Sequence, residues 1–419
     1  MTSSTALVST LAVVLVAVVV DAAWTHGWDT MKDQLWVDFY GVDHRTMPST
    51  AQFEFVAHHY AVVSLEKCFA MHAYPHTEDA VAAAAAVIKG FNSNVKIINY
   101  FNSEVNFISC YRCGKEFQQN PEWWLKDDSG APYMLNHDNA TRYYDLTQEA
   151  VRQFVAANSV NVPNASRLID GVFADKGGDH PLADMSAARF AAFEQAHHQS
   201  LNLTTHTARQ VLGPNSGVFA NAVNFYHGST QHGIEVLPFV DGLCFEHFNS
   251  FELVDPHTGQ LDPQLFQQSV DLIENATRMD KVVLVRGWPG PVGSPIGPLG
   301  PSWSKKYGPT PATHEGRAAA AKELLIPTLA SYLIVASNTT FLSYDWWYGI
   351  NDGVTPCPHD PTSCSGPSGW YPEFNRTIGA PLGRYSHDGG VPHLYTRQFE
   401  HIIVWFDASN TTNSTIQWN

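Results

Sequence analysis

The sequence predicts a (β/α)8 barrel followed by a short antiparallel β appendage. Short apolar segments alternate with helical patterns along most of the 419 residues, which is typical of βαβ units and a parallel sheet. Two of these segments, IDGVFAD at 169–175 and VDGLCFE at 240–246, repeat one pattern and end on a carboxylate. After residue 394 the pattern changes to YTRQF, IIVWF and TIQW, which indicates antiparallel strands.

The barrel strands are expected where short apolar runs are bounded by polar or turn residues, because such runs suit strands buried on both faces. In chain order they are residues 35–40, 61–65, 95–101, 169–175, 217–223, 240–246, 281–285 and 340–344. A chain of 46.3 kDa exceeds the usual size of one core, but barrels with insertions reach this length. We therefore assign residues 24–390 to the barrel and 391–419 to the appendage.

Helical patterns fill the intervals between these strands. They cover residues 51–59, 77–91, 148–157, 186–203, 263–279 and 314–335. Thr77 is expected to be the N-cap of its helix, with Glu78 and Asp79 in the first turn, where negative charge is favourable. Pro327 is expected to kink the last helix. A Gly- and Pro-rich loop at 287–314 follows the seventh strand, on the catalytic side of a barrel, and we expect it to gate or line a substrate site.

The amino terminus is typical of a secreted protein. Residues 6–20 are almost wholly apolar and are followed by small residues, so we expect a signal peptide over residues 1–23. An uncleaved anchor is the alternative, but the run is short for a span of about 20 residues. Eight sequons predict N-glycosylation at Asn139, Asn164, Asn202, Asn275, Asn338, Asn375, Asn410 and Asn413.

The six cysteines fit an oxidising compartment. Local spacing predicts two disulfides, Cys110–Cys113 in a C-x-x-C motif and Cys357–Cys364 around a Pro- and Ser-containing loop. Cys244 lies in a predicted strand and is expected to be a buried thiol. It could bond with Cys68 only if their strands were neighbours.

Composition excludes several classes of protein. A net charge of −16 with no Lys/Arg cluster excludes a nucleic-acid partner. Hydrophobic residues make up 44% and charged residues 15%, so the chain is not disordered. Several of the 12 Trp fall in loop-like segments, where exposed rings suit stacking on sugars and where rim packing is the plainer alternative.

The repeated strand pattern points to a paired-carboxylate site. Asp175 and Glu246 end the fourth and sixth predicted strands, at the face where α/β barrels place catalytic groups. Alternate strands contribute to one side-chain layer, so both acids are expected to face one cleft at the same height. A single strand-end acid has a plainer explanation, because loops are polar, and the repetition is what favours function.

The other strand ends add acids, amides, a guanidinium and aromatic rings. Each alone can be a solvated loop residue or part of a structural ion pair, but together they suit a sugar. The residues expected to contact substrate are Glu66, Tyr100, Asn102, Asn221, Arg286, Trp288, Asp345 and Trp346.

Several longer motifs carry a family resemblance. They are NYFNSE at 99–104, PEWWLKDDSG at 121–130, YYDLT at 143–147, GVFAD, GLCFEHF, PLGRY at 381–385 and YTRQFEHIIVWF at 395–406. With these motifs the chain resembles the glycoside-hydrolase-like barrels related to glycoside hydrolase family 114, the endo-α-1,4-polygalactosaminidase family. The resemblance implies that Asp175 and Glu246 are the catalytic pair. The Lys176-Gly177-Gly178 segment departs from the family pattern.

We therefore expect a secreted glycoside hydrolase that cleaves a polysaccharide or glycan and needs no cofactor or metal. Glu246 would be the general acid, and Asp175 the nucleophile or the base that activates water, although the two roles could be exchanged. A metal-dependent barrel hydrolase is one alternative. The chain has 20 His, but adjacent pairs such as His197-His198 point about 100° apart on a helix, so they do not chelate together. A non-catalytic glycan-binding barrel at the cell surface is the other alternative.

Overall fold

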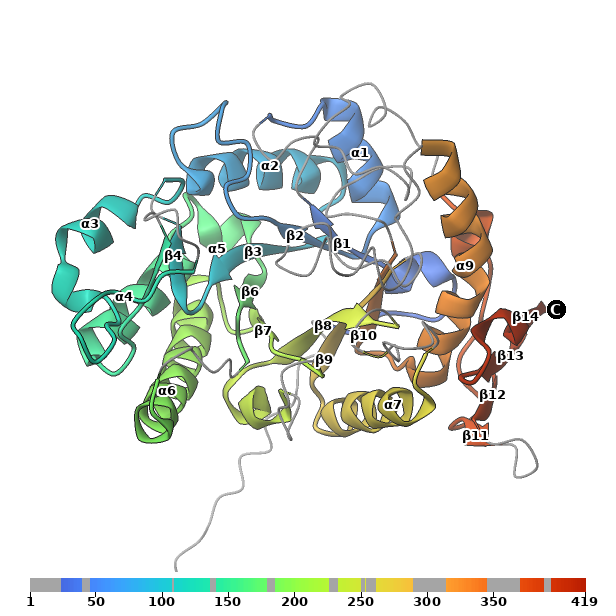
Figure 1. Ribbon diagram of the computed structural model, residues 1–419. Helices are drawn as coiled ribbons and strands as arrows, with labels where there is room; N and C mark the ends of the chain where they lie inside the picture. Colours follow the sequence, from blue (N-terminus) through green and yellow to red (C-terminus); the bar gives the residue numbers. More distant parts are fainter. Residues whose placement is uncertain are drawn as a thin grey trace, which may run out of the picture.

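A computed structural model describes residues 24–39, 46–107, 109–135, 141–178, 185–225, 233–249, 253, 261–288, 314–344, 370–387 and 393–419, without the side chains of 314–318. Within these ranges an eight-stranded parallel sheet curls into a barrel that helices surround (Figure 1). The strand order is β1-β2-β3-β6-β7-β8-β9-β10, and a bridge from Leu35 to Leu342 connects the two ends of the sheet. The predicted fold class is confirmed.

All eight predicted strands are present. They are β1 (Trp36–Phe39), β2 (Val62–Leu65), β3 (Lys96–Asn102), β6 (Gly171–Asp175), β7 (Gly217–Asn221), β8 (Gly242–Phe248), β9 (Val282–Gly287) and β10 (Thr340–Tyr344). Two core clusters explain why they are apolar throughout: one fills the barrel interior, and the other lies between the barrel and the helices.

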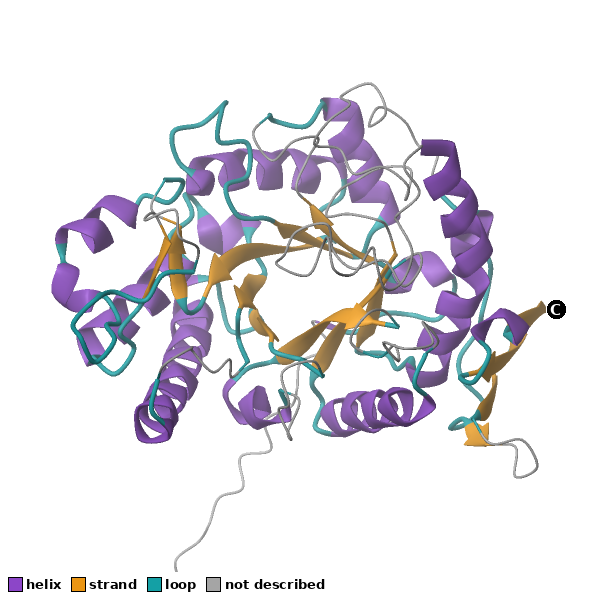
Figure 2. Ribbon diagram, in the orientation of Figure 1, coloured by secondary structure: helices purple, strands orange, loops and turns teal. Residues whose placement is uncertain are grey.

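The outer layer contains the predicted helices, shown in purple in Figure 2. They are α1 (Thr50–His59), α2 (Thr77–Phe91), α4 (Glu149–Ser159), α6 (Ala187–Val211), α7 (Pro263–Arg278) and α9 (His314–Val335). The expectation that Thr77 caps α2 is wrong, because the N-cap is His76. Thr77 is already helical, and its backbone N–H donates to the carbonyl of Cys110 at 2.9 Å.

The excursion after β3 forms a small lobe beside the barrel. It contains β4 (Val105–Phe107) and β5 (Thr141–Tyr143), which pair antiparallel, together with α3 (Gly114–Gln119) and the 3-10 turn η3 (Pro121–Trp123). The short elements α5 (Ala165–Leu168), η2 (Met31–Gln34), η4 (Ile234–Phe239) and η5 (Pro372–Asn375) complete the connections. Through this lobe, β3 leads to α4 and then to β6, the strand that ends on Asp175.

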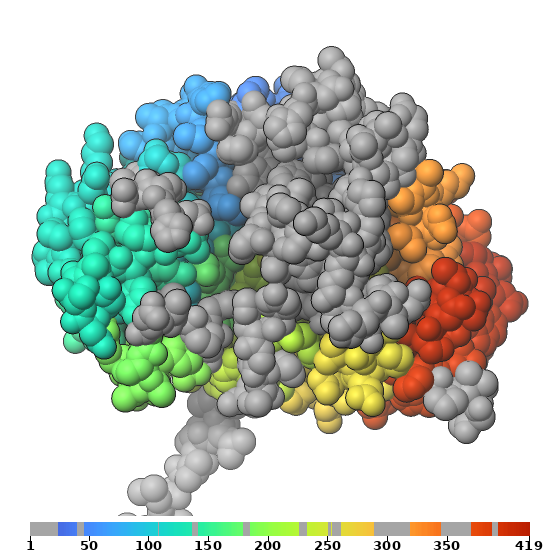
Figure 3. Space-filling view, viewed as in Figure 1, coloured from blue at the N-terminus to red at the C-terminus, as the bar shows by residue number. Residues whose placement is uncertain are grey.

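The predicted antiparallel appendage is also present. It consists of β11 (Ser386–His387), β12 (Leu394–Gln398), β13 (Ile402–Asp407) and β14 (Thr415–Trp418), with η6 (Thr411–Asn413) before the last strand. In the space-filling view this red segment lies against the orange α9 (Figure 3). Arg397 fixes the contact, because its guanidinium donates to the carbonyls of Leu333, Ile334 and Ala336 at 2.7–3.0 Å, at the end of α9. Burial lowers the pKa of Arg397 to about 10.

The cysteine pairing differs from the prediction. Cys110 is bonded to Cys68, and Cys113 is a buried free thiol. Cys113 is the N-cap of α3, and its sulfur accepts from the Asn106 amide at 3.8 Å, so the turn directs the two sulfurs of the C-x-x-C motif to different neighbours. Cys244 is a buried free thiol, as expected. The predicted Cys357–Cys364 pair lies outside the described residues.

The predicted glycosylation sites and the predicted signal peptide can be compared with the described residues. Of the sequon asparagines, Asn139 lies outside the described residues; the side chains of the others are exposed, except that of Asn275, which is half-buried. In the part of the chain that the structure describes, no helix combines the length and apolar character needed to cross a membrane. Residues 1–23 lie outside that part, and the signal peptide stays a prediction.

Candidate active site

The barrel strands place polar groups at their carboxyl ends by simple alternation. Successive side chains of a strand point to opposite faces, so a residue two positions after a core residue also points inward. The interior cluster takes residues from all eight strands, among them Trp36, Tyr100, Phe173, Phe219, Cys244 and Leu284. Two positions further, these strands carry Asp38, Asn102, Asp175, Asn221, Glu246 and Arg286. A polar layer therefore lies on top of the apolar filling of the barrel.

Asn221 brings the two predicted acids together. Its side-chain amide donates to Asp175 Oδ1 at 3.0 Å and to Glu246 Oε2 at 2.8 Å. Because both oxygens bond to one nitrogen, they lie within about 6 Å of each other. The site is a pair of carboxylates from β6 and β8 that share a donor from β7, the strand between them.

Four donors surround the Asp175 carboxylate. Tyr100 Oη and Asn102 Nδ2 (3.0 Å) donate to Oδ2, while Asn221 and the backbone N–H of Lys176 (2.9 Å) donate to Oδ1. Burial by itself raises the pKa of Asp175, but the charge of Lys67 and the hydrogen bonds from Tyr100 and Asn221 outweigh it. The pKa therefore lies below its ordinary value, and the carboxylate form is favoured.

A second pair of acids, more completely buried, lies at the ends of β1 and β2. Asp38 and Glu66 are almost completely buried and hydrogen-bond to each other, and Lys67 Nζ lies 3.0 Å from Glu66 Oε2. Burial first, and then repulsion from Glu66, raise the pKa of Asp38 well above its usual range. Arg286 Nη1 lies 4.0 Å from Asp38 Oδ2 and keeps this pair of acids from being isolated charges.

Glu246 lies against aromatic rings. The indole of Trp288 donates to the backbone carbonyl of Glu246 at 2.7 Å, and the guanidinium of Arg286 lies 4.5 Å from the centroid of that ring. The ring of His247 stacks on Trp288, and its Nε2 lies 3.7 Å from Glu246 Oε2. Burial lowers the pKa of His247, which favours the neutral ring beside the acid.

Most of the predicted site residues are thus gathered in one place. Tyr100, Asn102 and Asn221 contact the Asp175 carboxylate, and Trp288 contacts the backbone of Glu246. Glu66 and Arg286 lie beside Asp38. Asp345 and Trp346 lie outside the described residues. Sequence reasoning missed Asp38 and His247. The inward-facing period-two pattern of WVDF could have identified Asp38. His247 follows Glu246 at a register shift between Phe245 and Phe248, which no sequence pattern reveals.

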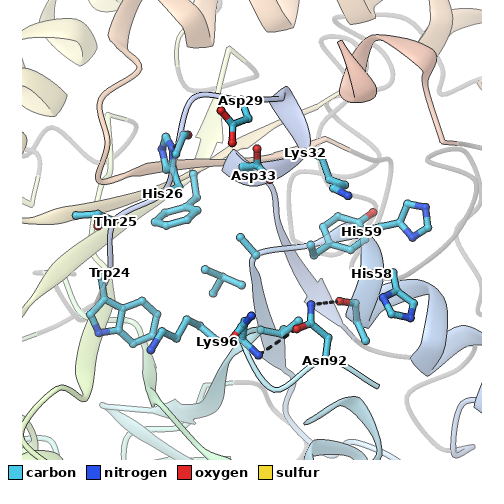
Figure 4. A pocket seen from close by; sticks show the side chains of 18 residues that line it. Trp24, Thr25, His26, Asp29, Lys32, Asp33, His58, His59, Asn92 and Lys96 are labelled. Carbon is cyan, nitrogen blue, oxygen red and sulfur yellow. Dashed lines mark hydrogen bonds between the residues drawn. The ribbon is translucent and has the colours of Figure 1, made fainter. Parts of the chain in front are cut away.

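A separate cavity lies on the opposite face of the barrel, where the strands begin (Figure 4). It has a volume of about 440 Å³ and is lined by residues before β1 and at the ends of α1 and α2, including Trp24, His26, Lys32, His58 and Lys96. Conserved catalytic groups of α/β barrels come from the other face, and the amino-terminal face serves stability. This cavity is therefore not the candidate active site.

The arrangement suits acid–base chemistry. Among the described residues, no group of three or more His, Cys, Asp or Glu is placed to hold a metal ion. His197 and His198 contact different neighbours, Ser103 and Phe239. Two carboxylates at short range, one held ionised, are the groups that glycosidic bond cleavage requires.

The barrel and this carboxylate site define a glycoside-hydrolase-like barrel. The comparison with protein families identifies the group more narrowly: the family described as hypothetical glycosyl hydrolase family 15 matches residues 89–403, and the chain belongs to it. The resemblance to glycoside hydrolase family 114 is confirmed only as a likeness to glycoside-hydrolase barrels. No curated protein is significantly similar in sequence.

Solved glycosidase structures are similar to the chain at a low level. The glycoside hydrolase domain of PelA from Pseudomonas aeruginosa is 14% identical, with a TM-score of 0.43 over 75% of this chain and 97% of that one. Ega3 from Aspergillus fumigatus in complex with galactosamine is 12% identical, with a TM-score of 0.37 over 64% and 80%. An α-amylase from Malbranchea cinnamomea is 11% identical, with a TM-score of 0.47 over 92% and 85%.

Proposed function

We propose that this protein is a secreted glycoside hydrolase that cleaves a polysaccharide or glycan with Asp175 and Glu246. One observation carries the proposal: Asn221 holds both carboxylates at once, at 3.0 and 2.8 Å. Membership of a glycosyl hydrolase family supports glycan hydrolysis in general. The leader, the sequons and the Cys68–Cys110 disulfide support secretion.

The environments of the two acids favour different roles. Asp175 is surrounded by donors that lower its pKa, so it is ready as a base or nucleophile at neutral pH. The Glu246 carboxylate lies beside the neutral ring of His247, and its backbone carbonyl accepts from the indole of Trp288, so we assign Glu246 the proton transfer to the leaving oxygen. With Glu246 as the acid and Asp175 as the nucleophile, β8 and β6 would each supply one catalytic group.

The separation of the acids favours retention of anomeric configuration. Retaining glycosidases hold their carboxyl groups about 5–5.5 Å apart, whereas inverting enzymes need about 6.5–9.5 Å to admit a water. A shared amide nitrogen keeps the bonded oxygens within about 6 Å, which leaves little room for that water. Asp175 would then form a covalent glycosyl-enzyme intermediate that water hydrolyses.

The test is a screen of the purified protein against a panel of polysaccharides, followed by near-isosteric variants. Asp175→Asn and Glu246→Gln should each lower turnover by at least about 10²-fold, the lower range for acid–base assistance. EDTA should leave wild-type turnover unchanged, and NMR of the first product should show retention. Wild-type turnover in both variants would refute the proposal. Binding without hydrolysis in the wild type would instead support a non-catalytic glycan-binding barrel.

Trp288 gives a second test, at the start of the long loop that follows β9. Residues 289–313 of that loop lie outside the described residues, and its role in gating stays a prediction. Trp288→Ala removes the ring that contacts Arg286, His247 and the backbone of Glu246. We expect a larger loss of kcat/KM than of thermal stability. Unchanged kinetics in a stable variant would remove Trp288 from the site.

A further inference from the structure

The Lys176-Gly177-Gly178 segment after Asp175 is held in an unusual backbone conformation. Lys176 has a φ of 55°, in the left-handed region that is uncommon for a non-glycine residue. A Cβ at Gly177 would lie 2.5 Å from the Cβ of Ala220, and one at Gly178 would lie 2.5 Å from the carbonyl oxygen of Ala222. The chain therefore turns away from β6 while pressed against β7, and Gly177 N–H donates to the carbonyl of Asn221 at 3.1 Å. This contact aligns Asp175 with Asn221.

Ser103, the residue after β3, holds the same turn from the other side. Its backbone N–H donates to the carbonyl of Asp175 at 2.9 Å. Its hydroxyl lies 2.8 Å from that carbonyl and 3.1 Å from the carbonyl of Lys176. Ser103 thus fixes the Asp175–Lys176 peptide, next to the left-handed φ of Lys176.

His197 on α6 completes the contacts of Ser103. Its Nε2 lies 3.0 Å from Ser103 Oγ. A hydroxyl has one proton, and both carbonyls can only accept, so His197 Nε2 must be the donor to Ser103 Oγ. The other ring nitrogen, Nδ1, faces Glu104 Oε1 at 3.7 Å, and all three side chains are almost completely buried.

The connectivity Ser–His–Glu is also that of a hydrolytic triad, but it cannot work as one here. A nucleophilic serine gives its proton to the histidine and must be open to substrate. The Ser103 hydroxyl is instead directed at two backbone carbonyls, and the residue is only 4% exposed. The three residues are therefore placed to hold backbone.

We propose that His197 and Ser103 are positioning residues for the carboxylate pair: they lock the Asp175–Lys176 turn and thereby aim the Asp175 carboxylate at Asn221. The effect on catalysis rests on the proposed function, whereas the positioning of the turn by His197 and Ser103 does not depend on it. Neither residue contacts the Asp175 carboxylate itself. His197 Nε2 bonds to Ser103 Oγ at 3.0 Å, and Ser103 Oγ bonds to the main-chain carbonyl of Asp175 at 2.8 Å.

The test compares His197→Leu, His197→Gln and Ser103→Ala with a matched control on the same helix, His198→Leu, whose ring stacks on Phe239. Gln can place an amide donor near the Nε2 position, so it should rescue what Leu removes. In crystal structures of His197→Leu and Ser103→Ala we expect the Asp175 carboxylate to turn away from Asn221, whereas in His197→Gln and the control it should stay.

Kinetics on a substrate from the screen supply the second readout. His197→Leu and Ser103→Ala should lower kcat by about 10- to 100-fold with little change in KM, the scale expected when a reacting group is misplaced by about 1 Å. The acid limb of their kcat/KM profiles should also move to higher pH, because the turned carboxylate loses the donors that oppose burial. A variant that is merely less stable loses active protein without moving that limb. Ser103→Ala deletes one oxygen and guards against a failure of the Leu variant to fold.

The outcomes separate this inference from the proposed function. If Asp175→Asn and Glu246→Gln turn over at the wild-type rate, the proposed function fails, and the crystal structures still decide the positioning. An unmoved Asp175 carboxylate in both His197→Leu and Ser103→Ala overturns the inference even if the enzyme is a glycosidase. An acid limb that moves as far in His198→Leu as in His197→Leu also overturns the inference.

Discussion

Replacing Asn221 by Leu tests the shared amide directly. Leu has nearly the same shape but donates no hydrogen bond, so the 3.0 Å contact to Asp175 and the 2.8 Å contact to Glu246 are both lost. Asp175 remains buried and keeps Tyr100, Asn102 and the Lys176 N–H as donors. The pKa of Asp175, which Asn221 helps to lower, should therefore rise.

The size of the rise follows from the bond that is removed. A hydrogen bond to a charged group contributes about 1.5–3 kcal/mol. Since one pKa unit corresponds to about 1.4 kcal/mol, the acid limb of the kcat/KM profile should move up by about one to two pH units. The direction is upward because the reaction proposed here needs Asp175 ionised, and the variant ionises it only at higher pH.

The assay is a pH–rate profile of wild type and variant, with Asn99→Leu as the matched control. Asn99 is also a buried strand asparagine, but its amide donates to the carbonyl of Ser159 at 3.0 Å, on the helix side of β3. The control should lose stability and leave the acid limb in place. An Asn221→Leu profile that coincides with the wild-type profile would refute the view that this amide tunes Asp175.

The same shift has a consequence for stability. A carboxyl whose folded pKa is lowered contributes stability that is present above its unfolded pKa and is lost as pH falls through the folded pKa. Wild type should therefore exceed Asn221→Leu in unfolding free energy by more at pH 7 than at pH 3, as measured by urea denaturation. A difference that is constant with pH would contradict this linkage.

Further predictions concern the fold. Gly177→Ala should destabilise the protein by about 1–3 kcal/mol in urea denaturation, because the added Cβ has no room. Gly90→Ala, in open space near the end of α2, should stabilise it by about 1 kcal/mol. Equal effects of the two substitutions would contradict the close contact at Gly177. A non-reduced peptide map should join Cys68 to Cys110, and a Cys110–Cys113 peptide would show the pairing to be wrong. Peptide-N-glycosidase treatment of protein from a secretory host should lower its mass, and an unchanged mass would count against use of the exposed sequons.

The local pattern of the chain was enough to predict the fold. Apolar runs bounded by turn residues gave all eight barrel strands, and β10 begins and ends where expected. The reason is that a strand buried on both faces must be apolar throughout, and a helix between strands must carry one apolar stripe. Both requirements act over a few residues and are visible without the fold.

The candidate site was predicted where it follows from strand ends, and missed where it depends on contacts across the barrel. The repeated pattern predicted Asp175 and Glu246 at matching strand ends, because strand ends share a height in a barrel. Asp175 does end β6, whereas β8 continues two residues beyond Glu246, to Phe248. That the amide of Asn221 bonds to both acids depends on the register of three neighbouring strands, and no sequence spacing encodes it.

What the sequence by itself determined is thus the fold class, the strands and the acids at their ends, since these depend on hydrophobic periodicity and chain polarity. The tertiary structure decided which groups meet. It paired Cys110 with Cys68 instead of Cys113, and it brought Ser103, the residue after β3, and His197 on α6 to one turn after β6. These contacts join residues far apart in sequence, and their partners are chosen by the direction of each side chain once the barrel has closed.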